Sequence, residues 1–431
     1  MPVRLIERLF GMEPGDLRPA LGLMTVYAAV GGAVAAGDAT VQAVFLSRAG
    51  ADRLPEVLLA RALALPLLAA LYARLARHRS PRAVMVTLAA LATLAAIGGW
   101  ILMERDGGGS LVAYVLHEVV TSLVTVHWGV YLLDHLSGPR ALRAVPVVHA
   151  AARLGAAVAG AMLAPLVALT DAPSGMLLTA SLFFLVAPLT VLRRPTGERV
   201  SPPERRASLA PADSDATEAS IPPPPPEGYR RLLSSPLLPA LVVSTGVMVF
   251  VRYALRYQQQ TVLETISEAE LVGLLAWYAA AGNLIGVVLQ VVIMGRVLSR
   301  VGLTLTNMAY AVMAAIAQGL LLLTPGLGSA LFARFADSEL KHAIKTPLSS
   351  LFYEAFEPQD RAPARAVVLG FASPAAQVLA SVGLFALVDL GTPTTAATVG
   401  IVACALFVVS TVAQNRGYER AIRRDSLPGR E

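Results

Sequence analysis

The sequence predicts an all-helical integral membrane protein. Hydrophobic residues make up 55% of the 431 residues, charged residues make up 15%, and the mean hydropathy is +0.62. Soluble domains usually carry about a quarter charged residues. Long apolar runs recur along nearly the whole chain. The chain is therefore expected to cross the bilayer many times rather than to be anchored by a single span.

Individual spans follow from the length of these runs, because a bilayer core needs about 20 apolar residues per helix. The first run is too long for the apolar region of a signal peptide, and no convincing cleavage site follows it, so it is expected to remain as a span. Twelve spans are predicted in all, at 21–46, 54–76, 81–103, 111–133, 141–169, 174–193, 237–263, 271–296, 302–323, 327–356, 363–388 and 394–416.

Basic residues predict the orientation of these spans. If the N-terminus is cytoplasmic, 25 arginines fall on the cytoplasmic side, and only Arg48, Arg53 and Arg105 fall in external loops. Cytoplasmic loops of membrane proteins are enriched in arginine and lysine. Both termini are therefore expected to be cytoplasmic. The same rule explains the pI near 9.7, so the basic balance does not indicate a nucleic-acid partner.

A linker divides the predicted spans into two halves. Residues 194–236 include "PPERR" and "PPPPP", which are typical of a disordered or polyproline segment. A shift of about 222 residues aligns "ARLARHR" with "GRVLSRV" at equivalent loops of the two halves. Two related six-helix halves indicate the major facilitator architecture of secondary transporters. The predicted domains are 1–193, the cytoplasmic linker 194–236, 237–416 and a cytoplasmic tail 417–431.

Ionisable residues within the spans are the candidates for function. Charges inside a membrane are costly and normally face the bundle interior or a water-filled path. Most of them fall on the first, fourth, seventh and tenth spans, which line the central cavity in the major facilitator architecture. On these four spans lie Asp38, His117, Glu118, Arg252, Arg256, Arg334, Asp337, Glu339, Lys341 and Lys345, and outside them lie Arg61, His149 and Arg153.

The tenth span holds the only two lysines of the chain, Lys341 and Lys345. Together with Arg334 and Asp337 they follow the spacing i, i+3, i+7, i+11, which is one stripe on a helix. Within the spans, seven basic residues face four acidic ones. An excess of positive charge favours an anionic substrate, because arginine binds phosphate or carboxylate in bidentate fashion and lysine acts as a point charge.

Several candidates also have a purely structural interpretation. Asp337 and Lys341 are four residues apart and can neutralise each other on one helix face. Arg61 can pair with Asp38 across the first two spans. Arg334 can lie close enough to the outer surface to be solvated. These alternatives stay open at the level of the sequence.

Several stretches resemble the ATP/ADP translocase (nucleotide transporter) family. The quoted stretches are "GDATVQAVFLSRAGADRLP", "YVLHEVVTSLVTVHWGVYLLDHL", "RALRAVPVVHAAARLGAAVAG" and "PLSSLFYEAFEPQDRAPARAVVLG". The resemblance covers all twelve spans through loose motifs. It implies that Lys341 and Glu118 correspond to family positions associated with nucleotide transport. The chain departs from the family in lacking a lysine in the first span, and Ser349 and Ser350 replace an expected lysine–glutamate pair.

The leading hypothesis is a secondary transporter of a bacterial-type inner membrane. It would move a nucleotide or another phosphate-bearing organic anion by alternating access. Lys345, Arg252 and Arg256 have no acidic neighbour at helical spacing. The residues expected to bind the anion are Lys341, Lys345, Arg252, Arg256, Arg153 and Arg334. Those expected to gate the path or couple protons are Asp38, Glu118, Arg61, Asp337 and His149.

Other classes of function are less consistent with the sequence. No nucleophile–base pair or metal-ligand set is apparent, so neither an enzyme nor a cofactor is predicted. The single cysteine, Cys404, excludes a disulfide framework. No glycine-rich loop is followed by lysine, which argues against an ATP-hydrolysing pump. The alternatives are an exporter of another small molecule with the same architecture, and a non-transporting scaffold or sensor whose "PPPPP" binds a soluble partner.

Overall fold

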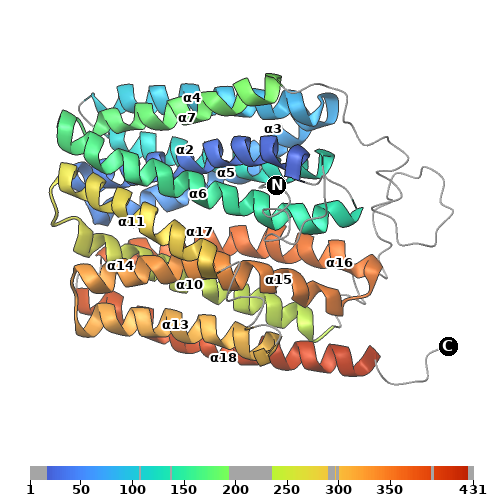
Figure 1. The fold of residues 1–431 in the computed structure, drawn as a ribbon. Helices are drawn as coiled ribbons and strands as arrows, with labels where there is room; N and C mark the ends of the chain where they lie inside the picture. Colours follow the sequence, from blue (N-terminus) through green and yellow to red (C-terminus); the bar gives the residue numbers. More distant parts are fainter. Residues whose placement is uncertain are drawn as a thin grey trace. The chain divides into compact units, whose positions relative to one another are not determined.

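Every regular element of the described chain is a helix (Figure 1). The structure is a computed structural model that describes residues 17–105, 108–135, 138–193, 235–289, 297, 300–389 and 393–425. Most of the predicted linker, residues 194–234, lies outside the described residues, and with it the predicted partner-binding segment. The predicted all-α fold class is confirmed.

Eleven helices among the described residues are long and apolar enough to cross a membrane. Two of them, α4 (Pro81–Met103) and α10 (Leu237–Leu263), have the bounds of predicted spans. The segment predicted as the tenth span is also helical, but it is too rich in charged residues to count among the eleven. The protein is thus a multi-pass membrane protein, while the twelfth span and the orientation of the termini stay predictions.

The surface of α3 (Leu54–His78) shows why these helices belong in lipid. Leu63, Leu67 and Leu71 are 55%, 74% and 62% exposed. Residues four apart lie on one face of a helix, so these side chains form a continuous apolar stripe. Soluble proteins rarely expose large contiguous apolar patches, whereas acyl chains accommodate such a stripe without cost.

The chain forms two compact units, and each is described separately. The first takes in Met1–Ala49, Leu63–Thr217 and Ile266–Val287. The second takes in Gly50–Ala62, Glu218–Thr265 and Val288–Glu431. The domain boundaries at 193 and 237, on either side of the linker, stay predictions.

In the first unit, α2 packs against three other long helices. It contacts α5, α6 and α7, while α4 contacts α5 and α7 (Figure 1). The unit contains most of α3, all of α4, and nearly all of α11 (Glu268–Val288). Its other elements are α2 (Leu17–Ala49), α5 (Gly109–His135), α6 (Gly138–Thr170), η2 (Ser174–Met176) and α7 (Leu177–Arg193).

Two glycines allow α2 and α6 to cross at close range. A Cβ atom added to Gly31 would lie 2.1 Å from the carbonyl oxygen of Ala152, and one added to Gly155 would lie 1.9 Å from that of Ala28. Both obstacles are backbone atoms, which cannot move aside. Small residues at such crossings are a common way for membrane helices to pack.

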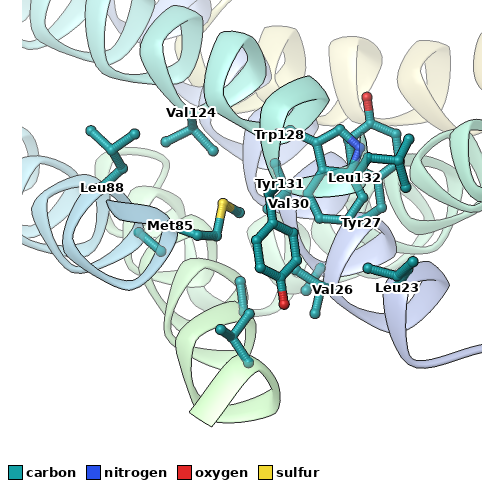
Figure 2. Close-up of a cluster of buried hydrophobic side chains, with 14 of the residues drawn as sticks. Leu23, Val26, Tyr27, Val30, Met85, Leu88, Val124, Trp128, Tyr131 and Leu132 are labelled. Carbon is teal, nitrogen blue, oxygen red and sulfur yellow. The ribbon is translucent and has the colours of Figure 1, made fainter. Parts of the chain in front are cut away.

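Figure 2 shows the buried side chains that hold this unit together. The ring of Tyr27 on α2 stacks on Trp128 of α5, with centroids 4.0 Å apart and planes inclined by 8°. Met85 and Leu88 of α4 belong to the same buried cluster. The cluster also includes residues of α6 and α7, so the core joins five helices of this unit.

In the second unit, α10 contacts α14, α17 and α18, and α18 also packs on α13 (Figure 1). The last helix continues past the predicted end of its span at 416. Besides α10, the unit contains the start of α3, η1 (Ala51–Arg53), α13 (Leu303–Leu323), α14 (Leu327–Phe335), η4 (Ala336–Lys345), α15 (Thr346–Phe352), η5 (Tyr353–Ala355), α16 (Pro358–Arg365), η6 (Ala366–Ala372), α17 (Ser373–Asp389) and α18 (Pro393–Asp425).

Two of these segments are π-helices. One is η4, which runs for 10 residues between α14 and α15, and the other is η6, which runs for 7 residues between α16 and α17. A π-helix closes i→i+5 hydrogen bonds, is rare, and occurs frequently at functional sites. Both lysines of the chain lie in η4. The helical irregularity and the concentration of charge therefore coincide.

Candidate anion-binding cavity

The second unit contains a cavity of about 400 Å³, and known ligand pockets typically measure about 300–1,000 Å³. Its walls come from the start of α3, from α10, from η4 and α15, and from the η6–α17 region. The charged side chains among its described lining residues are six basic groups and one carboxylate, namely Arg61, Arg252, Arg256, Lys341, Lys345, Arg365 and Asp337. The cavity thus has a large excess of positive charge.

The carboxylate of Asp337 is engaged by Arg252. Nε of Arg252 on α10 donates to Oδ1 of Asp337 on η4 at 2.5 Å, and the side chains are 24% and 12% exposed. Lys341 also interacts electrostatically with Asp337, but it is repelled by Arg252 and Arg256. The Asp337–Lys341 interpretation is therefore incomplete, because the close hydrogen-bonded partner comes from another helix. Among the described lining residues, Asp337 is thus a single carboxylate surrounded by several cations.

Arg252 keeps donors for a ligand. Its only hydrogen bond among the described residues uses Nε. The two terminal nitrogens of its guanidinium group make none within the described part of the chain. A guanidinium offers five N–H donors in a planar fork that matches phosphate and carboxylate. The arrangement can therefore bind an anion without first breaking the Arg252–Asp337 pair.

Lys345 is buried without a carboxylate partner in the described chain. The residue is 5% exposed. Nζ donates to Oδ1 of Asn307 at 2.9 Å and lies 5.8 Å from the ring centre of Phe407. Neutral groups thus hold a cation that is removed from bulk water. Buried charges are normally paired, so this site favours an anionic ligand.

Arg365 is a cavity residue that the sequence analysis did not select. It lies near the start of the span predicted at 363–388. In the structure its guanidinium carbon lies 5.2 Å from the ring centre of Tyr353, which also lines the cavity. The polar residues Ser373 and Gln377 lie on the same wall. Their spacing of four on an apolar span is a signal that could have identified this wall.

Asp38 has a partner that the sequence analysis did not consider. Nε2 of His117 lies 3.0 Å from Oδ1 of Asp38, which joins α5 to α2 in the first unit. Arg61, the partner that the sequence suggested for Asp38, lines the cavity of the second unit. The Asp38–Arg61 pair stays a prediction, because the two residues belong to different units. Glu118, the neighbour of His117, is 8% exposed.

Gly37 provides the space for the His117 ring, and we expect Gly37→Ala to destabilise the protein by about 1–2 kcal/mol. A Cβ atom at position 37 would lie 2.1 Å from Cε1 of the ring. The ring must then move and stretch its contact with Asp38. Thermal unfolding in detergent measures the effect, and Gly129→Ala is the control because a Cβ atom there meets nothing within 4 Å. Equal melting temperatures for the two variants would contradict this prediction.

Three other predicted residues lie outside the cavity lining. Nδ1 of His149 lies 3.0 Å from the hydroxyl oxygen of Tyr27, and the two rings meet edge to face. His149 is thus part of the aromatic packing of the first unit. Arg153, one turn further along α6, is half-buried in the same unit, and Arg334 is half-buried on α14. The cavity therefore brings together six of the eleven predicted site residues, Arg61, Arg252, Arg256, Asp337, Lys341 and Lys345.

The ranges that the structure describes contain no candidate metal site. No group of three or more histidine, cysteine, aspartate or glutamate side chains is placed to hold an ion there. What the cavity offers chemically is binding of negative charge.

The fold of this chain is similar to that of several solved structures. No family model matches the chain, and no curated protein matches it. Among solved structures, the nucleoside transporter NupG is similar with a TM-score of 0.65 and 12% identity over 94% of this chain and 99% of that one. A bacterial homologue of the human lysosomal transporter Spinster gives 0.58 and 13% over 97% and 100%. The xylose transporter XylE from E. coli gives 0.58 and 13% over 91% and 95%.

The fold is major facilitator-like. All of these structures are membrane transporters and none is an enzyme. At 12–13% identity the similarity shows the fold alone. The resemblance to the ATP/ADP translocase family is not shown by any of these comparisons and stays a prediction.

Proposed function

We propose that this chain is a secondary transporter of an organic anion, and that phosphate-bearing anions such as nucleotides are its substrate class. The observation that carries the proposal is the cavity of about 400 Å³ whose described charged lining is six basic groups and one carboxylate. Ionisable residues inside a membrane protein normally mark substrate or ion pathways. A cavity with this charge balance attracts anions and repels cations.

Roles can be assigned to individual side chains. Lys345 contributes a buried point charge, and Arg252 contributes the free edge of its guanidinium fork. Lys341, Arg256 and Arg365 add positive charge around the same volume. Asp337 offsets part of the positive charge of Arg252 and so limits how tightly an anion is held, which a transporter requires because it must release what it binds.

The fold supports transport as the activity. The similar structures are transporters, and one of them is described as a nucleoside transporter. A nucleoside is uncharged where a nucleotide carries phosphates, so the basic cavity is the feature that favours a nucleotide for this chain. The proposed location is a bacterial-type inner membrane. Asp38, Glu118 and His149 would act outside the cavity, in gating or proton coupling.

A ligand screen tests this proposal. The purified protein in detergent should melt at a higher temperature with ATP, ADP or a sugar phosphate, because a ligand that binds only the folded state stabilises it in proportion to RT ln(1 + [L]/Kd). An organic cation and an uncharged nucleoside at equal concentration are the controls. Uptake of the stabilising anion into proteoliposomes then establishes transport. Stabilisation by the cation or the nucleoside alone would contradict an anionic substrate.

A further inference from the structure

Lys345 is held at the end of a relay of two buried asparagines. Nζ of Lys345 donates to Oδ1 of Asn307 on α13 at 2.9 Å. Nδ2 of Asn307 donates to Oδ1 of Asn415 on α18, also at 2.9 Å. Nδ2 of Asn415 donates to the carbonyl oxygen of Thr304 at 2.8 Å. Asn307 is 1% exposed and Asn415 is 8% exposed.

The relay has a fixed direction. The carbonyl oxygen of Thr304 can only accept, so Asn415 must present its Nδ2 to it and its Oδ1 to Asn307. Asn307 must therefore donate through Nδ2, which turns its own Oδ1 toward Lys345. A carboxylate at position 307 has no donor to offer Asn415. The relay thus selects a neutral oxygen as the partner of Lys345.

We propose that Asn307 is a positioning residue that presents Lys345 to the cavity as a cation with no carboxylate partner among the described residues, so that the ligand must supply the negative charge. The inference rests on the proposed function, because it assigns charge selectivity to the same cavity. The ammonium of Lys345 donates to the neutral amide of Asn307 and also lies over the ring of Phe407. An ammonium has three donors, and Asn307 accepts one of them.

The contrast with Arg252 supports this assignment. Both cations line one cavity, yet Arg252 is paired with Asp337 at 2.5 Å while Lys345 meets a neutral amide. The nearest chemical change that would neutralise Lys345 is a single one, from the amide of Asn307 to a carboxylate. The chain carries the amide, together with the second asparagine that holds it in the required orientation.

Two substitutions at one position separate charge from structure. Asn307→Asp places a carboxylate against Lys345, and Asn307→Leu removes the hydrogen bond without adding charge. Asn283→Asp is the matched control, because it makes the same change on α11 at a residue that does not line the cavity. Each purified full-length variant is tested for binding of ATP and of pyrophosphate by thermal shift, and its melting temperature is also measured without ligand.

We expect N307D to weaken binding of both probes at least tenfold, N307L to weaken it at most about threefold, and N283D to leave it unchanged. Without ligand, N307D should melt above N307L, because its carboxylate compensates a buried cation. Equal weakening by N307D and N307L would overturn the inference and leave the proposed function standing. If the unaltered protein binds neither probe, the proposed function fails. The melting temperatures without ligand then decide the inference, which N307D melting below N307L would overturn.

Discussion

Replacement of both lysines, Lys341→Ala/Lys345→Ala, is expected to reduce uptake of a phosphate-bearing anion into proteoliposomes by at least about 100-fold. A hydrogen bond to a charged group contributes about 1.5–3 kcal/mol, and each 1.4 kcal/mol changes an affinity by about tenfold. Loss of two such contacts therefore removes binding at practical substrate concentrations. Initial rates of uptake of labelled ATP measure the effect.

The control for this double variant is His342→Ala. His342 lies between the two lysines in η4, but its side chain is exposed and is not part of the cavity lining. It therefore reports any general disturbance of the π-helical segment. Normal uptake by the double lysine variant would contradict the assignment of the cavity as the substrate site. Equal loss in H342A would assign the effect to the helix rather than to the charges.

The spacing of residues in the sequence was sufficient to predict that these lysines lie on one helix face. Asp337, Lys341 and Lys345 are spaced by four residues, and such positions stay on nearly the same face whether a helix turns every 3.6 residues or somewhat more slowly. The predicted stripe therefore survives in the π-helical η4, and all three line the cavity. Arg334 belongs to the same pattern but lies on α14, before the π-helical segment, and does not reach the lining.

Contacts between helices could not be predicted in the same way. Periodicity within one helix says nothing of which side chain another helix will place opposite it. Three such contacts join different helices, namely Asp337–Arg252, Asp38–His117 and Lys345–Asn307. Asn307 and Asn415 also carry no charge, so a search for ionisable residues passes over them. The relay becomes apparent only when α13 and α18 are seen to pack together (Figure 1).

Substitution of the cavity carboxylate, Asp337→Asn, is expected to tighten anion binding by about tenfold and to slow transport. The carboxylate offsets part of the positive charge that the ligand meets, since it accepts from Arg252 at 2.5 Å. An amide of the same size leaves the full guanidinium charge for the substrate. Release then becomes slower than in the unaltered protein, so both KM and kcat for uptake should fall together.

Without ligand, the D337N variant should be less stable than the unaltered protein, although it binds the anion more tightly. Removal of one partner from a buried ion pair costs about 3–5 kcal/mol, and the cost should lie at or below the lower end here because the Arg252 side chain is 24% exposed. The D337N variant should therefore melt at a lower temperature alone and gain a larger increase from ATP. Glu339→Gln is the matched control, because Glu339 is buried in the same η4 but does not line the cavity. An ATP-induced increase that is the same in D337N, E339Q and the unaltered protein would show that Asp337 does not weaken anion binding.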